Sequence, residues 1–304
     1  MSHTPSPLDA SFPRRRLGAA LAGVAALASL PRPTQAGDVP RAGERFLRFR
    51  MGRTVTYGVL EGDVVRQISG DLFGTWKRTG KRHRLADVRL LPPTVPTQVL
   101  ALAGNYLSHH DLTAVPPKFR IPQIFFKPPS CLVGQDDNVV IPAEARDVHF
   151  EAELVVVIGK ETRRVSKERA LEHVFGVTCG NDISERYWQN DENDKDVQWW
   201  RAKGTDTFGP VGPWITTGLD YGNLLLRLRQ NGNVKQEERT NRLIHDIPSM
   251  VSFISRHVTM KPGDLIFTGT PGTTSSIRPG DVLEVELEGV GVLRNRVVAE
   301  KSAA

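Results

Sequence analysis

The segment HFEAELVVVIGK, His149–Lys160, constrains the fold most strongly because acidic residues stand at the head of an apolar run. The consecutive β-branched residues Val155–Ile158 predict a buried β-strand. Glu151 and Glu153 are two residues apart, so on a strand their side chains point to the same face. Carboxylates beside an apolar core repel each other, and burial makes them costlier to charge. The sequence therefore predicts a partner for this pair.

A divalent cation is one such partner, because Mg²⁺, Mn²⁺ and Ca²⁺ all bind carboxylate oxygens. A third carboxylate would complete a typical open site. Asp182, in GVTCGNDISERYWQ (176–189), follows a short apolar strand and is the candidate. The ordinary alternatives are a solvated glutamate pair at a sheet edge and a turn-forming aspartate. The residues alone leave these alternatives open.

The chain has 304 residues, 39% hydrophobic and 24% charged, which is typical of a globular protein with one or two cores. Of the net charge of +6, residues 1–36 contribute +3, from four arginines and one aspartate, which leaves 6 − 3 = +3. No stripe of basic residues is interleaved with aromatics. We therefore expect no nucleic-acid partner.

The first 36 residues have the pattern of an export signal. Arginines 14–16 precede the apolar run Leu17–Leu30, and Thr34-Gln35-Ala36 follows. This order predicts a twin-arginine-like leader and a periplasmic protein. The run is short for a membrane span, so we expect no stable membrane association after the signal is removed. A mis-called start codon would instead leave the protein cytoplasmic.

Beyond the leader, the pattern indicates a β-rich α+β fold. Residues 44–70 alternate in short runs around a turn at 61–63, which predicts antiparallel strands. We assign a small N-terminal β-domain to 37–92, ending in a basic, proline-rich linker, and a second domain to 93–304. Within the second domain, Ser166 and Asp246 are expected to cap helices.

The two cysteines, Cys131 and Cys179, are the only ones in the chain. An even number in an exported protein is compatible with a disulfide. A core of this size needs no such crosslink, so we expect both residues to be small buried hydrophobes.

Four stretches carry a resemblance to a known family. They occur in the order AGNYLSHH; FFKPPSCLVG with FEAELVVVIG; GNDISERYWQ with KGTDTFGPVGPW; and KPGDLIFTGTPG. Together they resemble the fumarylacetoacetate hydrolase family over nearly all of the chain from about residue 100. The resemblance implies a β-roll or mixed β-sandwich catalytic domain, and commonly a homodimer.

The resemblance also implies a set of site residues. A divalent metal, Mg²⁺ or alternatively Mn²⁺ or Ca²⁺, would be held by Glu151, Glu153 and Asp182. Lys203 would face the substrate near the metal, and His109, in a lid over the pocket, would be the general base. The implied substrate-binding residues are Tyr106, Arg186, Gln189 and Thr270.

The chain departs from the family pattern around the base. In many members this histidine pairs with a glutamate three residues on, where this chain has Leu112. His110 is a second candidate for the base. The usual Asp-Tyr before the first glutamate is His149-Phe150 here, and the usual Ala-Arg-Asp is Glu185-Arg186-Tyr187. These changes leave the three carboxylates intact and bear on how water is activated.

The resemblance favours a metal-dependent hydrolase that cleaves a C–C bond of an acylpyruvate-type 2-oxo acid, with a small organic acid as partner. A decarboxylase, lyase or isomerase of oxaloacetate or hydroxy-dienoates would need the same enolate stabilisation. An alternative of another class is an exported protein that binds metal-chelated organic acids without turnover. These three possibilities remain open on the sequence.

Overall fold

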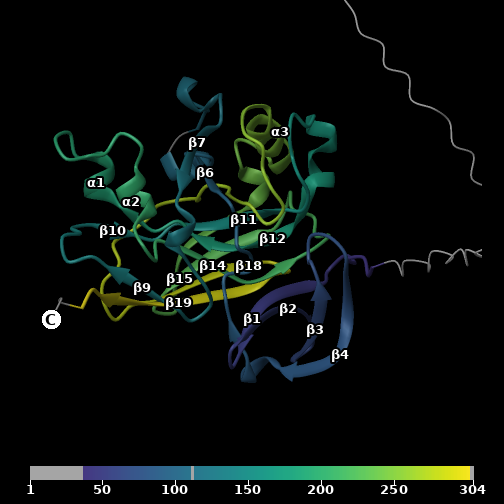
Figure 1. Ribbon diagram of the computed structural model, residues 1–304. Helices are drawn as coiled ribbons and strands as arrows, with labels where there is room; N and C mark the ends of the chain where they lie inside the picture. Colours follow the sequence, from purple (N-terminus) through teal and green to yellow (C-terminus); the bar gives the residue numbers. More distant parts are fainter. Residues whose placement is uncertain (1–36, 111–112, 302–304) are drawn as a thin grey trace, which may run out of the picture. The chain divides into compact units, whose positions relative to one another are not determined.

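The computed structural model describes residues 37–110 and 113–301. The predicted leader and Leu112 lie outside these residues. The described part is strand-rich, as the sequence predicts, and its longest sheet has the order β4-β3-β2-β1-β14-β12-β11-β17-β6-β7 (Figure 1). In chain order these strands are β1 (Arg45–Met51), β2 (Thr54–Glu61), β3 (Val64–Gly70), β4 (Trp76–Arg84), β6 (Val99–Ala103), β7 (Gln123–Lys127), β11 (Ala152–Ile158), β12 (Val174–Asn181), β14 (Gly209–Thr216) and β17 (Leu265–Phe267).

Two short strands join this sheet at its sides, and two smaller sheets complete the described strands. β5 (Arg89–Leu90) pairs with β1, and β8 (Leu132–Val133) pairs with β14. A five-stranded sheet has the order β16-β15-β18-β19-β9, and β10 pairs with β13. Their bounds are β9 (Asn138–Ile141), β10 (Val148–His149), β13 (Ser184–Glu185), β15 (Leu225–Gln230), β16 (Asn233–Arg239), β18 (Val282–Leu287) and β19 (Gly291–Ala299).

The described helices are short. The α-helices are α1 (Arg186–Asn190), α2 (Trp200–Gly204) and α3 (Ile247–His257). The 3₁₀ turns are η1 (Leu85–Asp87), η2 (Leu107–His110), η3 (Pro117–Phe119), η4 (Pro129–Cys131), η5 (Lys167–His173) and η6 (Thr240–Arg242). None of the helices in the described part of the chain is long and apolar enough to cross a membrane.

Strand β11 is buried on both faces, which explains its apolar run from Leu154 to Ile158. Leu154, Val156 and Ile158 belong to the main core, which also includes residues of α3 and the five-stranded sheet. Val155 and Val157 point to the opposite face and pack in a second cluster. The alternation of side chains along one strand thus supplies two cores.

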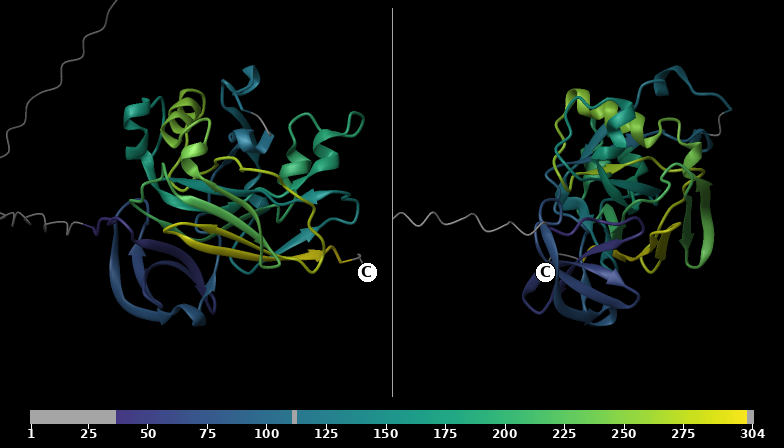
Figure 2. Two further views of the ribbon diagram at one scale, coloured as in Figure 1. Left: turned by 180° about the vertical axis from the view of Figure 1, so that it is seen from behind. Right: turned by 90° about the vertical axis from the view of Figure 1, so that its right-hand side faces the viewer.

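Of the two predicted helix caps, one is confirmed and one is not. Asp246 caps α3 as expected, because its side chain accepts the Ser249 N–H at 2.8 Å. Ser166 makes no side-chain cap, and the segment after it is the 3₁₀ helix η5 rather than an α-helix. In the two views of Figure 2, η5 and α3 lie side by side over the strands.

The N-terminal hairpins form as predicted, with β1, β2 and β3 antiparallel and Glu61-Gly62-Asp63 in the turn. The basic segment after them, predicted as a linker, contains β4, which pairs with β3. β4 is an edge strand whose exposed Lys81, Arg82 and Arg84 hide its strand pattern in the sequence. Charged residues on an edge strand discourage pairing with other chains.

Asp264 fixes the parallel pair β17 and β6, which leads into the loop at the site. Its fully buried carboxylate accepts the backbone N–H groups of Thr97 at 2.8 Å, Gln98 at 3.1 Å and Lys261 at 2.7 Å. It also accepts the Thr97 hydroxyl at 2.8 Å and the Gln98 amide at 3.0 Å. One side chain therefore satisfies donors from the segments that lead into both strands.

We predict that Asp264→Ala lowers the free energy of unfolding by about 3 kcal/mol or more, because it leaves these donors unpaired. Urea denaturation followed by circular dichroism measures the change. Asp63→Ala, in the exposed turn between β2 and β3, is the control and should change stability by less than about 0.5 kcal/mol. Equal stabilities of the two variants would contradict this role of Asp264.

Candidate functional site

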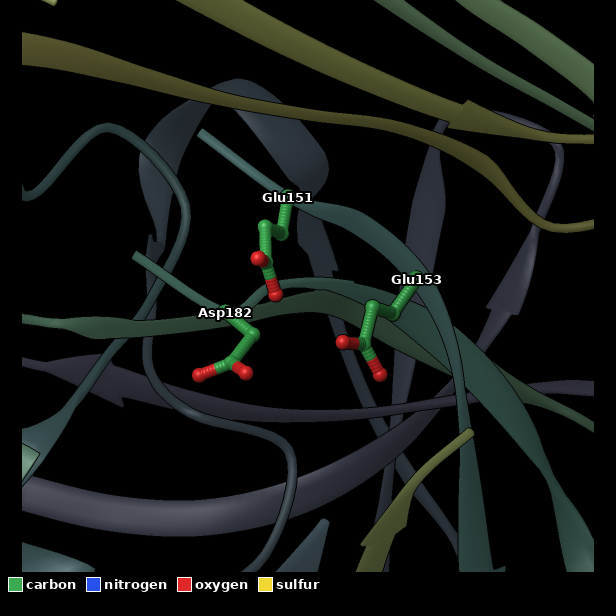
Figure 3. Close-up of side chains that lie close together, drawn as sticks. All are labelled: Glu151, Glu153 and Asp182. Carbon is green, nitrogen blue, oxygen red and sulfur yellow. The ribbon is translucent and has the colours of Figure 1, made fainter. Parts of the chain in front are cut away.

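The three predicted carboxylates meet at the ends of two paired strands. Glu151 precedes β11, Glu153 lies in β11, and Asp182 follows β12, which pairs antiparallel with β11. The Asp182 N–H donates to the Glu151 carbonyl at 2.8 Å, and this bond holds the ends of the two strands together. One oxygen from each carboxylate lies within 4.8 Å of the others, and all three residues are buried (Figure 3). The spacing in the sequence therefore produces a cluster in space.

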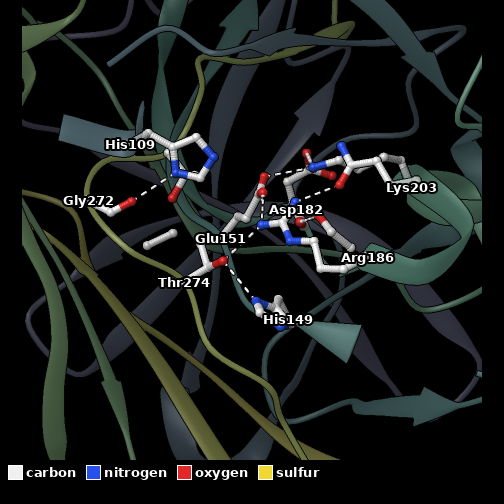
Figure 4. A network of polar contacts seen from close by, with 12 residues as sticks. His109, His149, Glu151, Asp182, Arg186, Lys203, Gly272 and Thr274 are labelled. Atoms are coloured by element: carbon white, nitrogen blue, oxygen red, sulfur yellow. Dashed lines mark hydrogen bonds and ion pairs between the residues drawn. The ribbon is translucent and has the colours of Figure 1, made fainter. Parts of the chain in front are cut away.

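Two of the three carboxylates have cationic partners. The Lys203 ammonium donates to Glu151 Oε2 and to Asp182 Oδ2, both at 2.7 Å. Arg186 Nη2 donates to Glu151 Oε1 at 2.5 Å (Figure 4). Although burial opposes ionisation, the charges of Lys203 and Arg186 hold the pKa of Glu151 far below its ordinary value.

Glu153 is the carboxylate without a cation in direct contact. Its Oε2 accepts the Gly269 N–H at 2.6 Å, and no described residue forms an ion pair with it. Burial, together with the neighbouring carboxylates of Asp182 and Glu151, raises the pKa of Glu153 well above its ordinary value. Ionisation of Glu153 therefore calls for a positive charge that no described side chain in contact with it supplies.

These residues fit a divalent ion. Three buried carboxylates offer hard oxygen donors within one small volume, the ligand type that Mg²⁺ and Mn²⁺ prefer. A cation at Glu153 would also remove the repulsion that raises its pKa. Among the described residues, this is the one group of three or more acidic, histidine or cysteine side chains with metal-binding spacing.

Lys127 is a site residue that our sequence reasoning missed. It ends β7, is buried, and donates from Nζ to Asp182 Oδ1 at 2.7 Å. Nζ also contacts the carbonyl oxygens of Lys203 and Phe208. Although burial disfavours its charge, Asp182 raises the pKa of Lys127. The signal in the sequence is a lysine at the end of the apolar run IFFK, where a surface lysine is not expected.

Helix α1 carries the next predicted residues. Arg186 and Gln189 face each other one turn apart, with Arg186 Nη1 donating to Gln189 Oε1 at 2.7 Å. Glu185 caps the helix by accepting the Trp188 N–H at 2.5 Å. Arg186 Nη2 also donates to Thr274 Oγ1 at 2.9 Å. The guanidinium is thereby held between the helix and the loop after β17.

The loop after β17 links several parts of the site. Thr270 is buried, and its hydroxyl accepts the Gln236 amide at 2.9 Å. The Gly272 carbonyl lies 2.8 Å from His109 Nδ1, and the Gly272 N–H donates to Ser108 Oγ at 3.1 Å. Ser108 and His109 of η2 thus bind the backbone N–H and the carbonyl of Gly272. Among the described residues, His109 is thus fixed by a neutral carbonyl and not by a carboxylate.

The two adjacent histidines have different surroundings. A carbonyl can only accept, so His109 Nδ1 carries the proton and Nε2 of the neutral ring keeps a free lone pair. His110 stacks on Phe119 with ring centroids 4.5 Å apart, and burial lowers its pKa. Its buried Nε2 has no hydrogen-bond partner among the described residues, which do not include positions 111 and 112. This contrast favours His109 as the base.

One pocket of about 740 Å³ brings most of the predicted residues together, a size suited to a small-molecule site. The predicted residues that line it are His109, Glu151, Arg186, Gln189, Lys203 and Thr270. Lys118, Phe119 and Trp199 form part of its wall. Tyr106 does not line the pocket. It is fully buried, and its hydroxyl finds no hydrogen-bond partner in the described part of the chain.

Both cysteines are free and buried, as expected from the sequence. Burial raises the pKa of the Cys179 thiol to about 12 and also raises that of Cys131. Thiols in such surroundings stay protonated and unreactive. Neither cysteine contributes to the pocket lining.

A family model described as the C-terminal domain of fumarylacetoacetate (FAA) hydrolase matches residues 98–298. The chain belongs to the fumarylacetoacetate hydrolase family. Residues 44–93 match a second model, the Rv2993c-like N-terminal domain. Protein Rv2993c of Mycobacterium tuberculosis is 44% identical over 266 residues, which is 82% of this chain and 98% of that protein. A mitochondrial oxaloacetate tautomerase of Bos taurus is 39% identical and covers 69% of each chain.

Solved structures of the family are similar to this chain over most of its length. A 2-hydroxyhepta-2,4-diene-1,7-dioate isomerase from Mycobacterium marinum aligns with a TM-score of 0.77 and 40% identity, over 85% of this chain and 100% of that one. A maleylpyruvate hydrolase from Sphingobium sp. SYK-6, solved with manganese(II) and pyruvate, aligns with a TM-score of 0.70 and 31% identity, over 84% and 100%. The family thus includes isomerases, tautomerases and hydrolases.

We predict that the wild-type chain binds Mn²⁺ and that Glu153→Gln and Asp182→Asn weaken binding at least tenfold, measured by electron paramagnetic resonance of free Mn²⁺. Because the pKa of Glu153 is raised in the metal-free protein, the ion must displace a proton. Binding should therefore weaken as pH falls and release protons in weakly buffered solution. Glu161→Gln, at an exposed ion pair, is the control. Equal Mn²⁺ affinity in all variants would rule out this site.

Proposed function

We propose that this chain is a divalent-metal-dependent hydrolase that cleaves a C–C bond of an acylpyruvate-type 2-oxo acid. The observation that carries the proposal is the arrangement of the pocket. It places an imidazole with a free Nε2 in the same cavity as the Glu151 carboxylate and the Lys203 ammonium. A base and a site for developing negative charge are the two elements that this hydrolysis needs.

The charge balance supports an anionic substrate with two charges. Lys127, Lys203 and Arg186 balance the three carboxylates of Glu151, Glu153 and Asp182. With a divalent ion at these carboxylates, the site has two positive charges in excess. A 2-oxo acid in its enolate form carries two negative charges, one on the carboxylate and one on the enolate oxygen. The site is thus matched to the form of the substrate that the reaction generates.

When bound, a divalent ion at this site would supply Lewis-acid stabilisation of charge on a substrate oxygen. Lys203 has a role of its own beside it. Its ammonium uses two N–H groups on Glu151 and Asp182, and its third remains for a substrate oxygen. Because Lys203 is buried, this bond would form in a medium of low polarity, where it is stronger than in water.

His109 would act on water. Its Nε2 takes one proton, and the oxygen adds to the distal carbonyl carbon of the substrate. The C–C bond then breaks, and its electron pair becomes the enolate of the pyruvate half. The proton on Nε2 returns to the enolate carbon, so the products are a carboxylic acid and pyruvate. The bond from Nδ1 to the Gly272 carbonyl keeps a proton on Nδ1, so Nε2 is the nitrogen that takes up and returns the proton.

A second candidate is a tautomerase, isomerase or decarboxylase of the same class of acid. The observation that favours it is the neutral partner of His109. The Gly272 carbonyl orients the imidazole but stabilises its protonated form less than a carboxylate would. A weaker base suffices to move a proton on a carbon already acidified beside a carbonyl. The similarity to an oxaloacetate tautomerase and to an isomerase agrees with this candidate.

We predict that protein beginning at Gly37, supplied with Mn²⁺, releases pyruvate from an acylpyruvate and stops when a chelator is added. His109→Ala should lower kcat about 10²–10⁴-fold with unchanged Mn²⁺ binding, because a general base contributes that much. His257→Ala, an exposed histidine of α3, is the control.

Other outcomes separate the candidates. Loss of the ultraviolet band of enolic oxaloacetate without pyruvate from acylpyruvates would support the tautomerase. Carbon dioxide from oxaloacetate would indicate a decarboxylase. Saturable binding of these acids with no chemical change over hours would instead support a binding protein. If His110→Ala and not His109→Ala abolishes turnover, His109 is not the base.

A further inference from the structure

Thr274 lies between the proposed substrate-binding Arg186 and a histidine that has no role in the reaction above. Its hydroxyl oxygen is 2.9 Å from Arg186 Nη2 and 2.9 Å from His149 Nδ1 (Figure 4). Thr274 also lines the pocket. One hydroxyl therefore connects a residue of the pocket to a side chain that is absent from the pocket lining.

His149 is itself fixed. Its Nε2 lies 3.0 Å from Asp147 Oδ1, and Asp147 also accepts the Ser276 hydroxyl at 2.5 Å. The backbone of His149 pairs with Ser184 of β13 on one side and bridges to Ser276 on the other. His149 is thus held by the hydrogen bond of its ring, by the pairing of its backbone with β13 and by the bridge to the loop after β17.

The direction of each hydrogen bond follows from its partners. The Asp147 carboxylate can only accept, so His149 Nε2 carries a proton. In the neutral ring, Nδ1 accepts, and the donor is the Thr274 hydroxyl. Arg186 can only donate, so Thr274 accepts from it. The Thr274 hydroxyl thus donates to His149 and accepts from Arg186.

This chain of bonds fixes the plane of the Arg186 guanidinium. Nη2 uses its two N–H groups on Glu151 and Thr274, and Nη1 uses one on Gln189. The second N–H of Nη1 and the N–H of Nε have no partner among residues 37–110 and 113–301. Since Arg186 lines the pocket, these free donors are available to an anionic ligand.

We propose that Thr274, oriented by His149 and Asp147, is a positioning residue that sets the guanidinium of Arg186 to bind the carboxylate of the 2-oxo acid. The inference rests on the proposed function for the identity of the ligand. Without the Thr274 hydroxyl, one Nη2 hydrogen loses its acceptor and the guanidinium can rotate about its remaining contacts. Binding of a planar dianion should then weaken, while the three carboxylates keep their contacts.

Oxalate is a suitable probe because it is a planar dianion with oxygens on two adjacent carbons, like a 2-oxo acid enolate. Isothermal titration of the Mn²⁺-loaded protein gives its Kd. We expect Thr274→Val to weaken oxalate binding about tenfold, the loss typical of one hydrogen bond to a charged group. Thr274→Ser, which keeps the hydroxyl, should stay within about threefold of wild type. Mn²⁺ affinity should be the same in both.

His149 provides the test that separates positioning from direct contact with the ligand. His149→Leu should weaken oxalate binding by a similar factor, and the double variant with Thr274→Val should be no weaker than either single variant. Additive effects would overturn the proposal, since Thr274 would then act without His149. Ser275→Ala is the control, because the Ser275 side chain is exposed and makes no hydrogen bond in the described part of the chain.

The remaining outcomes are also decisive. Wild-type affinity in Thr274→Val would overturn the positioning role. Loss of Mn²⁺ binding in that variant would overturn it too, because the hydroxyl would then support the fold of the site in general. If the wild-type protein itself binds Mn²⁺ but not oxalate, the proposed function fails, and this inference fails with it.

Discussion

The two hydrogen bonds that Lys203 donates, to Glu151 and to Asp182, connect the parts on which the site depends. They join the ends of β11 and β12 to helix α2, which begins directly after Trp199 of the pocket wall. Buried ion pairs recover their desolvation cost only when each partner is fully hydrogen-bonded. Here Lys127 and Arg186 complete the bonding of the same two carboxylates. The protein therefore carries a fixed, largely buried array of charges at the pocket.

The carboxylates of this array differ in their partners, and this difference indicates where a ligand binds. Glu153 has a backbone N–H as partner while its neighbours have cations. A structure selected only for stability would place a cation or an apolar residue there, because an uncompensated buried charge costs several kcal/mol. The same reasoning applies to Arg186, whose free N–H groups face the pocket. Groups left unpaired inside a well-paired network mark where a ligand belongs.

The sequence predicted what depends on local pattern. The apolar run of β11, the capping of α3 by Asp246 and the pairing of Glu151 with Glu153 are set by neighbours in the chain. Strand β4 was missed because its charges serve an exposed edge and mask the alternation. The family resemblance then grouped residues that are far apart in the chain, and most of them line one pocket.

Other parts of the site depend on contacts between distant positions, which the sequence alone does not bring together. Lys127 reaches Asp182 across 55 positions, and Thr274 reaches Arg186 across 88. The replacement of the usual glutamate partner by the Gly272 carbonyl involves a backbone atom, which every residue has. Contacts of this kind follow from the packing of the sheet and become visible only when strands are placed side by side.

Strand β11 is buried on both faces, so its register cannot shift by one residue without exchanging two sets of core side chains. Glu153 is therefore locked to the core, whereas the wall at Lys118 and Phe119 comes from a surface segment. The three carboxylates and this wall thus belong to separate segments of the chain. For protein engineering, this means that the wall can be diversified at Lys118 without altering the strand that holds Glu153, whereas Phe119 has to be kept because His110 stacks on it.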